Sequence, residues 1–364
     1  MRLDPRIAVD IPLVFDFPGA APDPRRTALI ALGKSALFMA TRFFRRHPSF
    51  RAVAGMAIVP EGLPRDDADL PSGLAVIAST HPQMTEKSFA AGAALVRFVS
   101  RHAPVVDTFI VLLSGGASAL VEHGPAPDEF SSLNHELLRA GLPIQEMNRR
   151  RIALSGIKGG KLARRAPDAD WLTFVMSDIP APDGHRLVGS MPSWSPDEPR
   201  HHLVPVADGG LLHDRYAAEL ARCGYRIAFE KRFLAGTVND WAHRIAAQEL
   251  RPGEALLITG EPTLALTVAT PGTGGRMAHL ALLLAERLDD GLTLHALSSD
   301  GIDGASPYAG IIFTPEERRR FDRSLIADHL ARFDAYSFFE KYGCALKTGY
   351  TGVNLNDVVV VTRD

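Results

Sequence analysis

Cysteine is nearly absent from this sequence of 364 residues, and the two present, Cys223 and Cys344, form no CxxC pair. A disulfide framework and a thiolate zinc site are therefore both disfavoured. Two reduced thiols suit a cytoplasmic protein, which is what we expect. The motifs HExxH and GxSxG are also missing, which argues against zinc chemistry and covalent hydrolysis.

Long apolar runs and a large excess of one charge are lacking too. No run of 18 apolar residues occurs, so no membrane span is expected. The N-terminal 20 residues carry Asp4, Asp10 and Asp16 and resemble neither a signal peptide nor an anchor. A formal net charge of -2 gives no electrostatic reason to expect nucleic acid or an anionic membrane as a partner.

What the sequence does contain is an alternation of short apolar runs and helix-like segments. Strands are predicted at 28–32, 54–60, 73–80, 108–115, 170–178, 226–230, 254–261, 264–269, 292–301 and 357–363. Helices are predicted around Ala36 to Phe43 and at 86–102, 131–143, 214–225, 237–250 and 276–288. This order predicts an α/β fold with mostly parallel sheets, and the length favours two domains that divide at Pro252-Gly253.

Glycine and serine crowd the end of one predicted strand, where the sequence reads Ser114-Gly115-Gly116-Ala117-Ser118. Glycine lets backbone N–H groups approach an anion closely, and the N-terminus of a following helix favours negative charge. Neither a Walker A loop nor GxGxxG is present. The segment predicts an anion site, with an unliganded strand-to-helix turn as the alternative.

Three basic residues stand beside segments that suit an anion: Lys34 after the run 28–32, Lys158 before Gly159-Gly160, and Arg276 after Gly272, Gly274 and Gly275. An ammonium or guanidinium next to accessible peptide N–H groups is suited to a phosphate or carboxylate. Each residue also has a plainer interpretation. Lys34 can extend to solvent, and the other two can lie in solvated loops.

Acidic and polar residues recur where strands are expected to end, which is where ligands bind in α/β folds. Asp178, Asp300 and Asp303 can serve Mg²⁺-nucleotide chemistry or cap turns. His81 can hydrogen-bond a substrate or cap a loop. Small polar groups near the C-terminus are Thr348, Thr351, Asn354 and Asp357. Together these loops indicate phosphate handling, because phosphoryl transfer depends on positioning and charge neutralisation.

Taken in order, ten segments resemble the glycerate 2-kinase family, also described as the DUF4147 plus MOFRL architecture. They cover almost the whole chain and read ALGKSALFMA, HPQMTEKS, VLLSGGASALVE, GLPIQEMNRRRIALSGIKGGKLA, VMSDIP, GS at 189–190, LLITGEPTLALTV, GTGGR, SDGIDG and TGYTGVNLND.

The resemblance implies a Rossmann-like domain 1–251 with a mainly parallel sheet, a smaller MOFRL-type α/β domain 252–364, and a ligand cleft between them. It implies ATP- and Mg²⁺-dependent phosphorylation of the 2-hydroxyl of D-glycerate, and a homodimer is a possible assembly. By motif, the catalytic residues are Lys34, Arg276 and Asp178. Substrate and phosphate are assigned to Ser114, Gly115, Gly116, Ser118, Lys158, Gly159, Gly160, His81 and Asn354. Nucleotide is assigned to Gly189, Ser190, Gly272, Gly274, Gly275 and Glu261, and metal to Asp178 and Asp300.

Several positions depart from the family pattern. The usual Gly-Ser-Gly-Pro-Thr is Gly-Ser-Met-Pro-Ser-Trp at 189–194, and Met191 is expected to hinder a conformation with φ > 0. The usual Gly-Arg-Asn-Gln-Glu becomes Gly-Arg-Met-Ala-His at 275–279. A kinase for another hydroxy or sugar acid, or a non-catalytic paralogue that binds a nucleotide or phosphorylated acid, is therefore the alternative. An oxidoreductase is a third hypothesis, which the lack of GxGxxG disfavours.

Overall fold

The computed structural model describes the chain except for residues 1–10, 64–68, 125–127, 131, 133–135 and 137–143. The chain forms two compact units. The N-terminal unit comprises residues 13–179 and 183–206, and the C-terminal unit comprises mainly residues 207–364. Each contains one six-stranded sheet, so the predicted α/β fold class is confirmed.

The sheet of the N-terminal unit has the order β3-β2-β1-β4-β5-β6. Its strands are β1 (Thr27–Leu32), β2 (Ala54–Pro60), β3 (Leu74–Ser79), β4 (Thr108–Ser114), β5 (Asp170–Met176) and β6 (His201–Ala207). The pairs among β1 to β5 are parallel. Every residue of β1 and β4 is buried, as expected for parallel strands that are covered on both faces.

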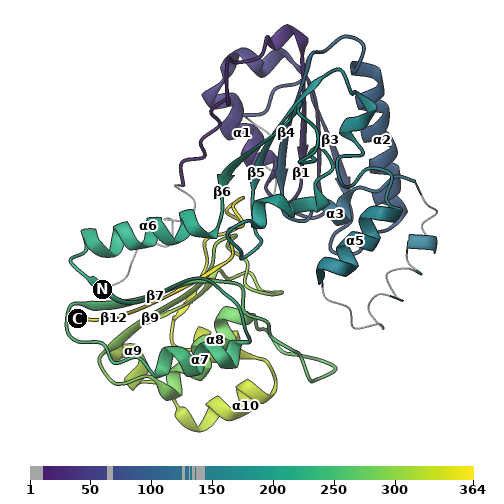
Figure 1. Cartoon of the computed structure of the whole chain (residues 1–364). Helices are drawn as coiled ribbons and strands as arrows, with labels where there is room; N and C mark the ends of the chain where they lie inside the picture. The colour runs from purple at the N-terminus through teal and green to yellow at the C-terminus, as the bar shows by residue number, and fades with distance from the viewer. Residues whose placement is uncertain (1–10, 64–68, 125–127, 131, 133–135, 137–143) are drawn as a thin grey trace. The chain divides into compact units, whose positions relative to one another are not determined.

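Helices cover both faces of this sheet, with α1 and α2 on opposite sides (Figure 1). The helices are α1 (Ala36–Arg46), α2 (Glu86–His102), α3 (Ala117–Leu120) and α5 (Ile144–Leu154), with short 3-10 turns η2 (Pro24–Arg26), η3 (Pro48–Ala52), η4 (Ala163–Arg165), η5 (Gly184–Arg186) and η6 (Val188–Ser190). The chain leaves β1 for β2 on one side and later returns to β4 on the other. The carboxyl ends of β1 and β4 therefore form the switch point at which such sheets bind ligands.

The sheet of the C-terminal unit has the order β11-β10-β9-β12-β8-β7. Its strands are β7 (Arg226–Leu234), β8 (Glu254–Gly260), β9 (Leu292–Ser298), β10 (Gly310–Phe313), β11 (Ala345–Leu346) and β12 (Asp357–Arg363). Only β7 and β8 pair in parallel among these neighbours, and the other pairs are antiparallel. The expectation of mostly parallel sheets fails here because the connection 299–309 from β9 to β10 is too short for a helical crossover.

In the C-terminal unit α6 lies on one face of the sheet, and α7, α8 and α10 lie on the other (Figure 1). The helices are α6 (Gly209–Arg222), α7 (Val238–Ala246), α8 (Arg276–Arg287), α9 (Pro315–Arg319), α10 (Ile326–Ala331) and α11 (Ala335–Glu340), with the 3-10 turn η7 (Arg323–Leu325). Residues 277–285 of α8 are all buried, so this helix lies at the centre of the unit's core.

Some boundaries differ from the sequence prediction. The compact C-terminal unit also takes in α6 and β7, which precede Pro252-Gly253, because β7 pairs with β8 in one sheet and α6 packs against both strands. The predicted strand 264–269 is not a strand, and β6 and β10 were not predicted. The predicted helix 131–143 lies mostly outside the described residues. Within the described ranges, no helix combines the length and apolar character needed to span a membrane.

Candidate active site

Two turns at the switch point of the N-terminal sheet are bonded to each other. The N–H of Lys34 donates to the carbonyl of Gly115 (2.9 Å), and the N–H of Ser35 donates to Ser114 Oγ (3.0 Å). Gly33 has φ +119°, and a Cβ there would clash with Ser114. Only glycine allows the turn after β1 to approach the turn after β4 this closely.

Three of the predicted site residues gather around this paired turn. A Cβ on Gly116 would lie 3.1 Å from Lys34 Cγ and 3.2 Å from His81 Nε2, so both side chains face that glycine. A Cβ on Gly115 would overlap the carboxylate of Asp178. The fold therefore brings Lys34, His81 and Asp178, which the sequence nominated separately, to the glycine-rich segment.

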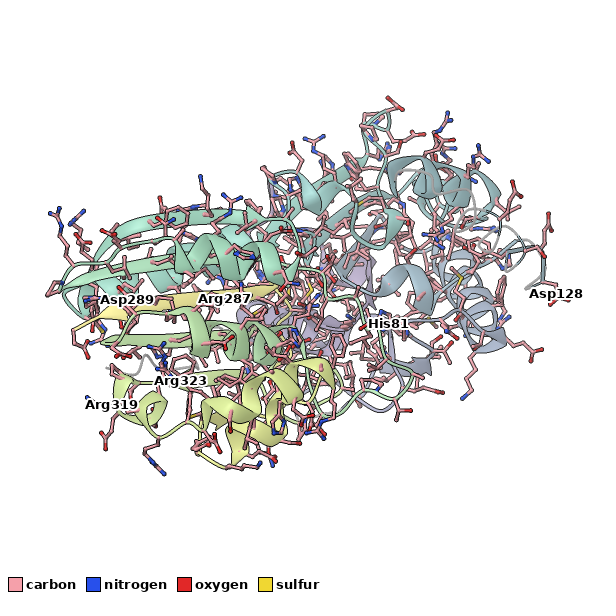
Figure 2. The ribbon with its side chains drawn as sticks, turned by 90° about the horizontal axis from the view of Figure 1, so that it is seen from below. His81, Asp128, Arg287, Asp289, Arg319 and Arg323 are labelled. Carbon is pink, nitrogen blue, oxygen red and sulfur yellow. The ribbon has the colours of Figure 1, made fainter. Side chains whose placement is uncertain are left out.

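The electrostatics of this cluster keep His81 neutral. Burial lowers the pKa of the His81 imidazole to about 4, and the positive charge of Lys34 adds to the shift. His81 lies on the segment that follows β3 and is labelled in Figure 2. At pH 7 the cluster thus contains the basic side chain of Lys34 and a neutral imidazole that can accept a hydrogen bond.

Titration of His81 tests this arrangement. We expect the carbon chemical shifts of the His81 ring to titrate near pH 4 in NMR spectra of histidine-labelled protein. Lys34→Met removes a cation that disfavours protonation, so the His81 pKa should rise while burial still holds it below 6.5. A His81 pKa that is the same with and without Lys34 would contradict the proximity of the two groups.

The second predicted anion loop, Lys158 to Gly160, serves the fold instead. Lys158 is 1% exposed, and its Nζ lies 2.8 Å from Glu122 Oε2 and 4.8 Å from the ring centroid of Phe130. Burial lowers the pKa of Lys158, and the carboxylate of Glu122 opposes that shift. The prediction that Lys158 binds substrate phosphate is wrong for this structure, because its charge is neutralised inside the core.

The peptide groups of the same loop are also occupied. The N–H of Gly159 donates to the carbonyl of Ser190 (2.9 Å), and the N–H of Gly160 donates to the carbonyl of Met191 (2.7 Å). Both glycines have positive φ, and a Cβ on Gly160 would crowd Ser195. These amides therefore hold the segment 189–191 rather than cradle an anion as predicted.

Lys158→Met should destabilise the protein by about 3–5 kcal/mol, because it leaves the carboxylate of Glu122 buried without its cation. Urea denaturation measures this loss. The double variant K158M/E122Q removes the buried charge and should recover part of the stability. An unfolding free energy of K158M equal to that of the wild type would show that the buried pair is not formed.

The segment 189–191 has an unusual backbone. Gly189, Ser190 and Met191 have φ values of +59°, +58° and +48°, so Met191 does adopt the conformation that it was expected to hinder. The Oγ of Ser190 lies 3.2 Å from the Oγ of Ser118. Left-handed backbone costs a non-glycine residue about 1–2 kcal/mol, and the bonds from Gly159 and Gly160 hold the segment in place.

In the C-terminal unit the predicted cation Arg276 is bound to two carboxylates. Its Nη1 donates to Glu261 Oε1 (2.5 Å), and its Nε lies 3.3 Å from Asp357 Oδ2. Asn356 also donates from Nδ2 to Glu261 Oε2 (3.4 Å). Burial raises the pKa of Asp357 to about 7, and the guanidinium of Arg276 opposes this rise.

The turn of Gly272, Gly274 and Gly275 makes room for protein carboxylates. Cβ atoms at Gly272 and Gly275 would clash with Asp334 and Asp303, respectively. Asp303 is fully buried and accepts the N–H groups of Met277 (3.1 Å) and Ala278 (2.8 Å). The N-terminus of α8 is thus capped by Asp303, which disagrees with the prediction that this turn holds a nucleotide phosphate.

The remaining predicted residues of the C-terminal unit lie in turns. Asp300 Oδ1 accepts the N–H of Ile302 (3.0 Å), and Asn354 Oδ1 lies 3.4 Å from the N of Asn356. Both therefore stabilise their own loops. Asp303, which the sequence suggested as a metal ligand or a turn residue, by contrast accepts hydrogen bonds from outside its own loop, from Met277, Ala278 and Tyr336.

Asp303→Asn should lower the unfolding free energy by about 1–3 kcal/mol. The amide offers one acceptor oxygen, so either Met277 or Ala278 loses its partner inside the core. Tyr336→Phe, which removes only the hydroxyl that donates to Asp303 (2.9 Å), should cost about 1 kcal/mol. Thermal or urea unfolding of both variants measures the difference, and an Asp303→Asn protein as stable as wild type would contradict the capping role.

In the part of the chain that the structure describes, no three His, Cys, Asp or Glu side chains are grouped as a metal site. Asp178 belongs to the N-terminal unit and Asp300 to the C-terminal unit. Magnesium in nucleotide sites is commonly bound by one or two carboxylates together with the substrate phosphates. Asp178, which lies against Gly115 beside Lys34, fits that mode, whereas Asp300 is engaged in its own turn.

Two family models and several proteins of known name match this chain. The family model described as "Domain of unknown function (DUF4147)" matches residues 9–221, and that of the MOFRL family matches residues 254–357. A glycerate 2-kinase of Sulfurisphaera tokodaii is 31% identical over 92% of this chain and 90% of its own length. The chain belongs to the glycerate 2-kinase family. The resemblance read from the ten segments is therefore confirmed.

A second similar sequence and a similar solved structure accompany this match. A protein of Agrobacterium vitis named as a putative hydroxypyruvate reductase is 31% identical over 79% of this chain and 88% of its own length. The crystal structure of glycerate kinase from Thermotoga maritima matches with a TM-score of 0.79 and 23% identity, covering 93% of this chain and 92% of that one. The latter shows a shared fold.

Proposed function

We propose that this chain transfers the γ-phosphoryl group of ATP to the 2-hydroxyl of D-glycerate or of a closely related small hydroxy acid. The observation that carries the proposal is the cluster of Lys34, His81 and Asp178 around Gly115-Gly116 at the switch point of the N-terminal sheet. Membership of the glycerate 2-kinase family supports a phosphotransferase with an alcohol acceptor. Its glycerate kinase relatives support ATP as the phosphate donor.

In this reaction the acceptor oxygen bonds to phosphorus, the bond from phosphorus to the leaving oxygen of ADP breaks, and the hydroxyl proton of the acceptor is released to solvent. Catalysis of such transfers rests mainly on positioning and charge neutralisation. Lys34 supplies positive charge, and the neutral imidazole of His81, which burial and Lys34 keep unprotonated, can accept a hydrogen bond from the acceptor hydroxyl. Arg276 is the second proposed cation, oriented by Glu261 and Asp357.

A magnesium ion bound with the nucleotide would neutralise phosphate charge, and the Asp178 carboxylate is the residue that would hold it. The chain's own residues have a separate task. Lys34 is held at its backbone by Gly115, so its side chain starts from a fixed point beside the glycine-rich turn. Preorganised charge of this kind contributes more to catalysis than a mobile lysine would.

A second candidate, reduction of a 2-oxo acid with NAD(P)H, comes from the name of the Agrobacterium vitis relative. The turn between β1 and α1 argues against a reductase. A dinucleotide site needs peptide N–H groups there for the pyrophosphate, but those of Lys34 and Ser35 already donate to Gly115 and Ser114. Mixing the protein with NADH and hydroxypyruvate should leave the absorbance at 340 nm unchanged, and a steady decrease would favour the reductase.

Substitution of the two cations tests the kinase. Lys34→Ala and Arg276→Ala should each lower kcat for glycerate at least 100-fold in an ADP-release assay, since each removes positive charge from the transferring group. Lys87→Ala and Arg287→Ala are the matched controls, because Lys87 lies in an exposed ion pair with Glu61 and Arg287 is exposed. Both controls should retain the wild-type rate.

The outcome divides the hypotheses. Full activity in both Lys34→Ala and Arg276→Ala would overturn the assignment of these residues. A wild-type protein that binds ADP but phosphorylates no acid in a panel of hydroxy and sugar acids would support a non-catalytic paralogue. Turnover with another acid but not with glycerate would keep the kinase and change its acceptor.

A further inference from the structure

The N-terminal unit contains a pocket of about 180 Å³ that the proposed chemistry does not use. Apolar side chains supply most of its wall, from α5 and from the segment after η5: Ile152, Leu187, Met191, Trp194 and Pro196. Arg186 lies at its edge, with the guanidinium carbon 5.7 Å from the centre of the Trp194 ring system. Aromatic and apolar walls with one donor group suit a flat, weakly polar ring.

This pocket is in contact with the glycine-rich turn of the candidate active site. Ser190 lines the pocket, and its Oγ lies 3.2 Å from the Oγ of Ser118, which directly follows Gly116 and Ala117. A Cβ on Gly189 would lie 2.9 Å from the Cβ of Ala117. The turn that contains Lys34 and the apolar pocket are therefore neighbours within one unit. A ligand that has both phosphates and an aromatic ring needs such a pair of sites side by side.

We infer that the pocket formed by Met191, Trp194, Ile152 and their neighbours receives the purine base of the nucleotide donor, whose phosphates lie at the Lys34 turn. The inference rests on the proposed function, which requires such a donor. The base stacks on Trp194, and Met191 closes the pocket from the interior, where it is 5% exposed. The left-handed backbone of Ser190 and Met191 directs these residues, and strain of this kind is concentrated at functional sites.

A pocket of about 210 Å³ in the C-terminal unit is the competing location for the base. It is lined by Leu264, Leu266, Phe333 and His279 beside the N-terminus of α8. The N–H groups of Thr273, Met277 and Ala278 there are already bound to the carboxylates of Asp334 and Asp303. Phosphates thus have a better site beside the Trp194 pocket.

Tryptophan fluorescence gives a direct test. The chain has three tryptophans, and Trp171 and Trp241 are fully buried while Trp194 is partly exposed. Titration with ADP should quench or shift the emission of the wild type, and Trp194→Phe should abolish the change while calorimetry still detects ADP. Pyrophosphate, which has no base, should bind without altering the emission. ADP binding with unchanged wild-type emission would overturn the inference.

Kinetics supply the second readout. Base–aromatic stacking is worth about 1–3 kcal/mol per base, so Trp194→Ala should raise KM for ATP about 5- to 150-fold while KM for glycerate and kcat stay near wild type. Trp194→Phe keeps a ring and should restore most of the affinity. His279→Ala, in the other pocket, should leave KM for ATP unchanged, and an increase with that variant alone would place the base there.

These results separate the inference from the function on which it rests. A wild type that phosphorylates glycerate, with KM for ATP unaffected by Trp194→Ala, would overturn the base pocket and leave the kinase intact. A wild type that phosphorylates no acid, yet shows ADP quenching that depends on Trp194, would overturn the kinase and support the base pocket.

Discussion

The hydrogen bond from the N–H of Lys34 to the carbonyl of Gly115 is the contact on which the rest of the candidate site depends. It joins the turn after β1 to the turn after β4, at the point where the order of the sheet changes direction. Because Gly33 admits this approach, the side chain of Lys34 starts beside Gly116, where His81 also lies. The same bonds occupy the peptide groups that a dinucleotide would need, so one local constraint favours phosphoryl transfer over hydride transfer.

In both units a glycine leaves room for a carboxylate that packs against it. Gly115 accommodates Asp178, Gly272 accommodates Asp334 and Gly275 accommodates Asp303. In the C-terminal unit the carboxylates bind the amides of the turn and of α8, so they stabilise the fold. In the N-terminal unit the carboxylate of Asp178 lies at the same glycine-rich turn as a lysine and a neutral imidazole. These are residue types that bind phosphate or take part in catalysis. Similar glycine-rich sequences thus perform different tasks according to the acid that packs against them.

This distinction explains how far the sequence could predict the site. The α/β class and the family followed from the order of elements and motifs, and Lys34, His81 and Asp178 were nominated singly as candidates, whereas their proximity is visible only in the fold. The role of Lys158 could not be predicted from the sequence, because its partner Glu122 lies 36 positions earlier and only the fold brings the two charges together in the core. Likewise, nothing local to Gly275 reveals that Asp303 will cap α8. Met191 shows the opposite case: its left-handed conformation was judged unfavourable, yet bonds from Gly159 and Gly160 hold the segment there.

The central claim is that negatively charged phosphate binds at the turn formed by Lys34 and Gly115-Gly116. A crystal structure of the protein with a non-hydrolysable ATP analogue and D-glycerate tests this most directly. The account predicts phosphate oxygens within hydrogen-bond distance of Lys34 Nζ and next to Gly116. Phosphates bound at another strand end, with Lys34 turned away from them, would contradict it.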